Sequence, residues 1–93
     1  MRQHEIGMLV RSKSGHDHGR VYVIMDMQDE YLFLVDGKMR TLSNPKKKKV
    51  KHVQGIDIVM TEIVTRKGNN TLIDETIKRA IKLYEASHQD TSL

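Results

Sequence analysis

Residues 20–35, "RVYVIMDMQDEYLFLV", carry the strongest strand signal in the sequence. Residues 20–27 are apolar on both alternating faces, which is typical of a central strand covered on two sides. The tripeptide "QDE" turns the chain, and residues 31–35 form a second doubly apolar strand. Two such strands in succession predict the centre of a mainly β domain.

Weaker strand signals flank this centre. The alternation in "IGMLVRS" predicts a half-buried strand near residues 6–12, and the loop "KSGHDHG" after it is bracketed by two glycines that suit an ordered turn. Beyond Val35, Asp36-Gly37 indicates a type I′ hairpin, and "KMRTL" a short returning strand that ends at Pro45. The alternation in "VKHV" predicts the next strand, so that the lysine run before it, residues 46–49, occupies the corner between strands. Short strands with frequent turns predict a small barrel or sandwich.

The periodicity changes after Gly55. The apolar residues from Ile56 to Val64 match one helical face, although their many β-branched side chains leave a strand possible over residues 56–66. Residues 71–74 have the spacing of a capping box, and an apolar stripe behind them predicts a longer helix over residues 72–87. We therefore expect a barrel over residues 1–55 and a helical extension over residues 56–93, packed on or beside the barrel.

The composition excludes several classes of protein. The 93 residues include no cysteine, which excludes thiolate zinc sites, disulfides and thiol nucleophiles. No nucleotide-binding glycine motif or nucleophile elbow occurs, and the chain is too short for a shielded cleft, so we expect no catalytic residues, cofactor or small-molecule substrate. No apolar run approaches the roughly 20 residues that span a bilayer, and no signal peptide is recognisable. These features predict a soluble, cytoplasmic protein.

Positive charge is concentrated in the first half of the chain. Residues 1–53 carry 11 Lys and Arg against 6 Asp and Glu, whereas residues 54–93 carry 5 against 6. Clustered positive charge indicates a polyanionic partner, either nucleic acid or an anionic membrane. We favour nucleic acid, because the basic residues lie between strands and the clearest amphipathic helix has mixed charge.

The stretch from "IGMLVRSKSGHDHGRVYVI" through "LVDG" to "PKKKKVKH" resembles the KOW-motif RNA-binding proteins over roughly residues 5–53. Within that group it is similar to small bacterial members related to an archaeal and eukaryotic large-subunit ribosomal protein. The resemblance implies a five-stranded SH3-like barrel whose loops rest on RNA, commonly ribosomal RNA. One departure is "GHDH", where the family commonly has lysine or arginine.

Two basic segments are the candidate interface. The glycine-bounded loop at residues 13–20 lets backbone N–H groups approach phosphates, and the lysine run would share one rim with it. The residues that we expect to contact RNA are Lys13, Ser14, His16, His18, Arg20, Arg40, Lys46, Lys47, Lys48, Lys49, Lys51 and His52. Lysine suits phosphates, and most of the aromatic residues lie in apolar stretches that should be core. We therefore expect recognition of folded RNA by shape and backbone, without a stacking platform.

Other interpretations remain open. The loop glycines could merely close a hairpin, and the lysines could be a solvated edge or, as "PKKKKVK", a nuclear import signal. His16 and His18 could share a metal, but no further ligand has a recognisable spacing, so we expect no metal site. A protein-interaction module of the transcription or translation machinery, like the KOW adaptors of the NusG type, is the alternative function. For RNA binding, the sequence does not decide between a permanent ribosomal protein, an assembly factor and a regulator.

Overall fold

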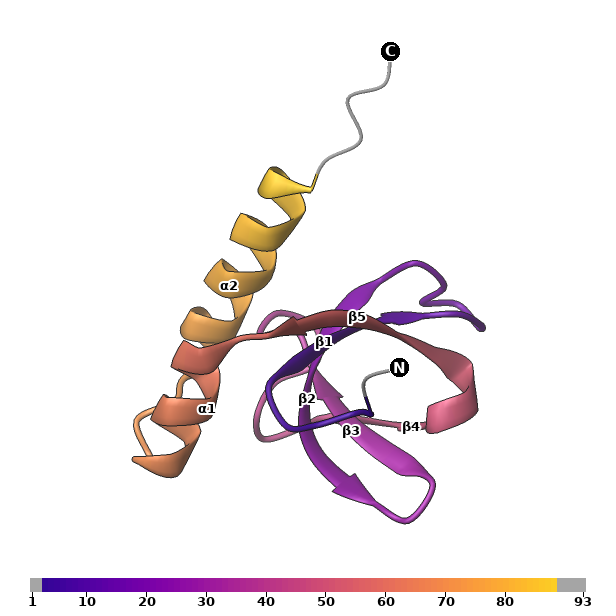
Figure 1. Cartoon of the computed structure of the whole chain (residues 1–93), viewed down its shortest axis with the longest axis horizontal. Helices are drawn as coiled ribbons and strands as arrows, with labels where there is room; N and C mark the ends of the chain where they lie inside the picture. Colours follow the sequence, from indigo (N-terminus) through magenta and orange to yellow (C-terminus); the bar gives the residue numbers. More distant parts are fainter. Residues whose placement is uncertain (1–2, 89–93) are drawn as a thin grey trace.

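The computed structural model describes residues 3–88 and contains one curved sheet of five antiparallel strands followed by two helices (Figure 1). The strands are β1 (Met8–Ser12), β2 (Val21–Gln28), β3 (Tyr31–Val35), β4 (Lys46–Lys49) and β5 (Val53–Val59), and the helices are α1 (Thr61–Gly68) and α2 (Asp74–Ser87). The spatial order of the strands is β4-β3-β2-β1-β5, and a 3-10 turn, η1 (Val50–His52), joins β4 to β5. The predicted fold class, a small mainly β barrel-like domain with C-terminal helices, is confirmed.

The core has two layers because β2 is buried on both faces. Val21, Val23 and Met25 pack with Ile63 of α1 and Ile77 of α2. The alternate residues of β2, Tyr22 and Ile24, pack inside the barrel with apolar residues of β1, β3 and β5. Each large aliphatic side chain that is fully buried in this way stabilises the fold by roughly 1.5–3 kcal/mol. The predicted two-sided burial is therefore confirmed for Val21–Met25, but it is wrong for Met27, which is 41% exposed where β2 extends toward its turn.

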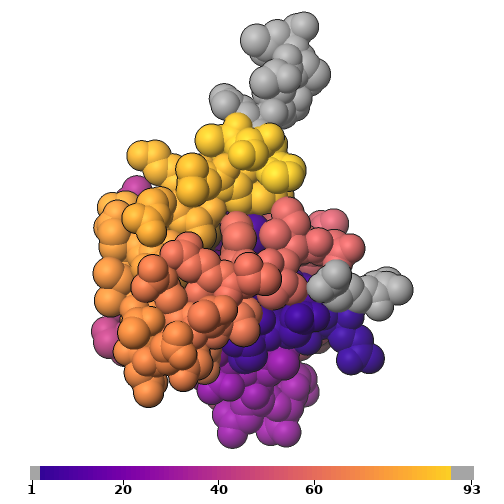
Figure 2. Space-filling view, turned by 60° about the vertical axis from the view of Figure 1, so that its left-hand side comes forward, coloured from indigo at the N-terminus to yellow at the C-terminus, as the bar shows by residue number. Residues whose placement is uncertain are grey.

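The α1–α2 unit covers one side of the barrel, and the β2–β3 hairpin protrudes beyond it (Figure 2). No helix within residues 3–88 is long and apolar enough to cross a membrane.

The connection between β3 and β4 differs from the prediction. Gly37 has a φ of 78°, but Asp36 does not adopt a positive φ, so the type I′ hairpin is wrong. The Asp36 carboxylate instead accepts hydrogen bonds from the backbone N–H groups of Lys38 and Arg40, which closes a wider turn. Residues 38–42 form no strand, because the backbone N–H of Leu42 donates to Asp74 of α2 rather than to a ladder. The lysine run, expected to be a corner, is itself the next strand, β4.

The region around residues 56–66 is divided between the two structures that the sequence left open. β5 pairs with β1 up to Val59, so the helix expected from residue 56 is wrong over its first turn, and the barrel extends past residue 55. Pairing with β1 gives one edge of this segment the hydrogen bonds of a sheet ladder, which decides between the two structures. The helix begins at Thr61.

The longer helix is confirmed over Asp74–Ser87, but its capping box is wrong. The N-cap is Ile73, and no side chain caps the helix. The Asp74 carboxylate binds the N–H of Leu42 at 2.7 Å, so it ties the β3–β4 connection to α2. A side chain at Gly37 would clash with the carbonyl of Asp74, which shows how closely this connection packs against the helix. Residues 89–93 of the expected extension lie outside the described residues.

Candidate nucleic-acid interface

The lysine run presents its side chains alternately to the two faces of the sheet. β4 pairs with β3 so that Lys46 and Lys48 lie opposite Leu34 and Leu32, which are buried inside the barrel. Lys47 and Lys49 lie opposite Phe33 and Tyr31, which are half-buried on the outer face. Because successive strand residues point to opposite faces, four identical residues enter two different environments.

The inner lysines converge on Asp17 in the loop between β1 and β2. The Lys48 ammonium lies 3.1 Å from Asp17 Oδ1, and its side chain is only 10% exposed. The Lys46 ammonium lies 3.4 Å from Asp17 Oδ2. Lys48 also donates to the backbone carbonyl of Ser14 at 3.0 Å. The two basic segments therefore lie side by side, as expected, but an acidic residue joins them.

Two hydroxyl groups complete the environment of Asp17. Ser12 Oγ donates to Oδ1 at 2.9 Å, and the phenolic hydroxyl of Tyr22 donates to Oδ2 at 3.0 Å. Asp17 is 9% exposed, so this carboxylate has exchanged water for ammonium and hydroxyl donors. Among residues 3–88, no buried side-chain nitrogen or oxygen lacks a hydrogen-bond partner.

The electrostatics of this cluster favour a charged carboxylate and a neutral phenol. Burial alone would raise the pKa of Asp17, but the hydrogen bonds from Lys48, Ser12 and Tyr22, with the charge of Lys46, outweigh it and hold the pKa well below its ordinary value of 3.8. Burial, and then the hydrogen bond to Asp17 and its negative charge, raise the pKa of Tyr22 to about 12. At neutral pH the lysines therefore face a permanent negative charge.

The loop that carries Asp17 is ordered by its own backbone hydrogen bonds. Gly15 and Gly19 have φ values of 84° and 88°, which confirms that the loop uses them for left-handed turns. The guanidinium of Arg11 donates to the carbonyl of Gly19 at 3.0 Å. The backbone N–H of Lys13 donates to the carbonyl of His52 at 2.8 Å, which fixes the start of the loop beside η1.

The predicted contact residues divide by exposure and position. Lys48 is an internal ion-pair partner, and Lys46 and Ser14 take part in the same contacts. Arg40 lies in the β3–β4 connection, which Asp74 ties to α2, and its backbone N–H and carbonyl close the turn with Asp36. His52 is half-buried in η1, and Lys49 is paired with Glu30 at 3.5 Å. The predicted residues that remain exposed, with no ion pair within residues 3–88, are Lys13, His16, His18, Arg20, Lys47 and Lys51.

The outer face of the hairpin carries aromatic rings beside lysines. The Lys47 ammonium lies 4.4 Å from the centre of the Tyr31 ring, and that of Lys49 lies 6.0 Å from it. These distances allow cation–π attraction, which holds both ammonium groups over the strand. Most of the aromatic residues are expected in the core, but Tyr31 and Phe33 are half-buried on this face.

Sequence reasoning missed the residues that organise the site. In the sequence, Asp17 is simply the residue between two histidines and Tyr22 one residue of an apolar strand, so neither is recognisable as part of a site. The signal for Tyr31 and Phe33 was present, because Tyr-Leu-Phe-Leu alternates aromatic and aliphatic residues and a strand places the two kinds on opposite faces. Among the residues described, no three His, Cys, Asp or Glu side chains form a group that could hold a metal ion.

In comparisons with known proteins, the chain matches no family model and no curated protein.

Proposed function

We propose that this protein binds RNA without catalysing a reaction, and that it contacts the phosphate backbone of folded ribosomal RNA in the cytoplasm. The proposal rests on the arrangement of charge together with the resemblance of residues 5–53 to KOW-motif proteins. In this proposal the chain is associated with the large ribosomal subunit and takes part in translation.

The observation that carries the proposal is that exposed lysines stand on three segments that ion pairs and backbone hydrogen bonds join. Lys13 begins the β1–β2 loop, Lys47 lies on β4, and Lys51 lies on η1. The contacts of Lys46 and Lys48 with Asp17 hold the loop against β4, so the segments that carry these lysines stay together. Segments that are already held together lose less conformational entropy when a phosphate backbone binds.

The burial of Lys48 and the ion pairs of the run reduce the number of phosphates that the rim can neutralise. If all five lysines of residues 46–51 each replaced one counterion, the logarithm of the affinity would fall with the logarithm of salt concentration at a slope of roughly −3.5 to −4.5. With Lys13, Lys47 and Lys51 as the free lysines, we expect a slope of about −2 to −3. An affinity that does not depend on salt would contradict contact through phosphates.

Sedimentation of a lysate of expressing cells through a sucrose gradient tests the proposed partner. We expect the protein to sediment with the large ribosomal subunit at low salt and to move to the top fractions at high salt. Migration with RNA polymerase, or as free protein at low salt, would contradict the ribosomal assignment.

One observation favours the alternative, a protein-interaction module. α2 exposes 62% of Leu83, beside a hollow of about 340 Å³ that Ile58, Met60 and Tyr84 also line. An acidic or apolar partner protein could bind this side of the helix. The two functions respond to different changes, because Leu83→Ser would release a protein partner but leave RNA affinity and its salt dependence unchanged.

A further inference from the structure

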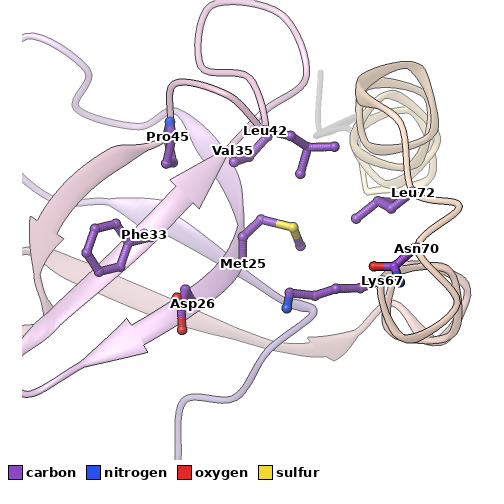
Figure 3. Close-up of a pocket in the computed structure, with 9 residues that line it drawn as sticks. All are labelled: Met25, Asp26, Phe33, Val35, Leu42, Pro45, Lys67, Asn70 and Leu72. Carbon is purple, nitrogen blue, oxygen red and sulfur yellow. The ribbon is translucent and has the colours of Figure 1, made fainter.

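A pocket of about 410 Å³ lies between the outer face of the sheet and the α1–α2 connection (Figure 3). Met25 and Asp26 of β2 with Phe33 and Val35 of β3 form one side, and Lys67, Asn70 and Leu72 form the other. Leu42 and Pro45 of the β3–β4 connection complete the lining. This volume falls within the range of small-ligand sites, roughly 300–1,000 Å³.

Six of the nine residues that line the pocket are apolar, and one of these six is aromatic. Phe33 is half-buried, and Met25 is 6% exposed at the base of the pocket. In the close-up, the Met25 side chain extends from the sheet toward Leu72, and the Phe33 ring lies on the far side of Met25 (Figure 3). A flat ring that entered the pocket would therefore meet an aromatic ring and a thioether, both of which bind π-systems well.

Several polar groups of the pocket are available to hydrogen-bond a ligand. Asp26 Oδ1 accepts the backbone N–H of Met27 at 2.8 Å, but Oδ2 has no hydrogen bond within residues 3–88. The Lys67 and Asn70 side chains are exposed and make no hydrogen bond or ion pair with the described part of the chain. Figure 3 shows the Lys67 side chain extending from α1 across the pocket toward β2. Apolar residues with a few convergent polar groups are typical of small-ligand sites.

The surroundings are positively charged. Lys47 lies directly opposite Phe33 in the β3–β4 register and on the same face, and Lys67 stands on the opposite wall. A phosphate on either side of a bound ring would meet an ammonium group. This charge favours a nucleotide within a strand over an apolar peptide side chain.

We propose that this pocket binds one unpaired, amino-bearing base of the RNA, while the adjoining phosphates lie along Lys47 and Lys67. This inference rests on the proposed RNA-binding function and deepens it. The free Asp26 oxygen accepts a hydrogen bond from the exocyclic amino group of the base, and the Phe33 ring stacks on the base. Uracil has a carbonyl oxygen at the position of the cytosine amino group, so the same placement of the base puts an acceptor against the carboxylate. The protein would thus read one base besides the shape of the folded RNA.

Three fluorescein-labelled RNA stem-loops test the inference, identical except for a bulged cytidine, a bulged uridine or no bulge. Fluorescence anisotropy with the full chain at low salt gives the affinities. We expect the cytidine bulge to bind about tenfold more tightly than the uridine bulge or the fully paired stem, since one good base contact or stack contributes roughly 1–3 kcal/mol.

The variant Asp26→Asn tests the proposed hydrogen bond. An amide can donate to the uracil carbonyl, so the preference for cytidine should disappear or reverse, while affinity for the paired stem rises only slightly through the lost negative charge. Asp29→Asn is the matched control, because it makes the same change in the β2–β3 turn at a positive φ of 56°, which asparagine tolerates. The control should keep the cytidine preference.

The ring of Phe33 is tested separately. Phe33→Ala should remove the advantage of the bulge, and Phe33→Tyr should retain it. If Phe33→Ala does not fold, the change of preference in Asp26→Asn remains decisive.

Equal affinity for all three stem-loops would overturn the base pocket and leave the proposed function standing. Absence of binding to every stem-loop would overturn both. If cytidine monophosphate alone shifts the Asn70 side-chain amide signal in NMR spectra and the bulge has no effect, the pocket binds free nucleotides, and the inference is wrong.

Discussion

The two faces of β4 carry the same residue and have different physical roles. The inner lysines, Lys46 and Lys48, contact Asp17, whereas the outer lysines, Lys47 and Lys49, lie near the Tyr31 ring. The Lys48 side chain is 10% exposed and that of Lys49 is 40% exposed. A run of identical charges is therefore not one binding surface, because the pleat of the strand assigns each residue to a side.

The difference between the faces follows from desolvation. An ammonium group that leaves water is stable only when a carboxylate and hydrogen-bond acceptors replace its hydration, and removal of that partner is strongly destabilising. An ammonium group in water contributes little to folding, since exposed ion pairs yield about 0–1 kcal/mol. We therefore assign stability to the inner face and ligand contact to the outer face. The following changes test that division.

Charge reversal on the two faces should give the largest contrast. Lys46→Glu with Lys48→Glu places two carboxylates beside Asp17, and we expect the free energy of unfolding to fall by more than about 4 kcal/mol or the chain not to fold. The matched pair, Lys47→Glu with Lys49→Glu, should fold nearly as well as the wild type and lose RNA binding. Urea denaturation followed by circular dichroism measures the free energy of unfolding of both double variants, and fluorescence anisotropy measures their RNA binding. Equal stability of the two double variants would contradict the division of β4.

Removal of the Asp17 charge should have the next largest effect. In Asp17→Asn, Lys48 keeps its buried position without a carboxylate, and we expect a loss of about 3 kcal/mol in the free energy of unfolding. Asp29→Asn, an equal change at an exposed site, should stay within about 0.5 kcal/mol of the wild type. A stable Asp17→Asn variant would mean that water replaces the carboxylate at little cost.

Acidification should weaken the ion pairs of Asp17 without a substitution, because it protonates the carboxylate. The pKa of Asp17 is lower in the folded chain than its ordinary value of 3.8, so its contribution is fully present above that value and is lost as the pH falls below it. We expect the free energy of unfolding of the wild type to fall more steeply below about pH 4 than that of Asp17→Asn. Urea denaturation at each pH measures the free energy of unfolding of the two proteins. If it falls equally with pH for both, folding does not hold Asp17 in its charged form.

The sequence predicted those parts of the fold that depend on local alternation. Residues 8–12, 21–28 and 31–35 alternate or are apolar throughout, and the structure has strands there. The lysine run could not be recognised as a strand, because four like charges disfavour a sheet until β3 supplies the hydrogen bonds and Asp17 supplies a counter-charge. The Asp17–Lys48 contact joins residues 31 positions apart, and no local pattern predicts it.

The candidate site was predicted in its segments but not in its details. The loop at residues 13–20 and the lysine run are adjacent, but which lysines face solvent depends on register, and register depends on the turn before β4. That turn was expected to be a hairpin and instead is shaped by Asp36 and by the contact of Leu42 with α2. A shift of one residue in this register would exchange the two faces of β4.

The salt dependence of RNA affinity for Lys47→Gln and Lys48→Gln tests the division of β4 most directly. These neighbouring substitutions remove the same charge from opposite faces. With a fluorescein-labelled fragment of large-subunit ribosomal RNA, at a temperature where both variants are folded, we expect Lys47→Gln to make the slope less negative by about 0.7–0.9, and Lys48→Gln to leave it unchanged while lowering stability. Equal changes in slope for the two variants would contradict the account.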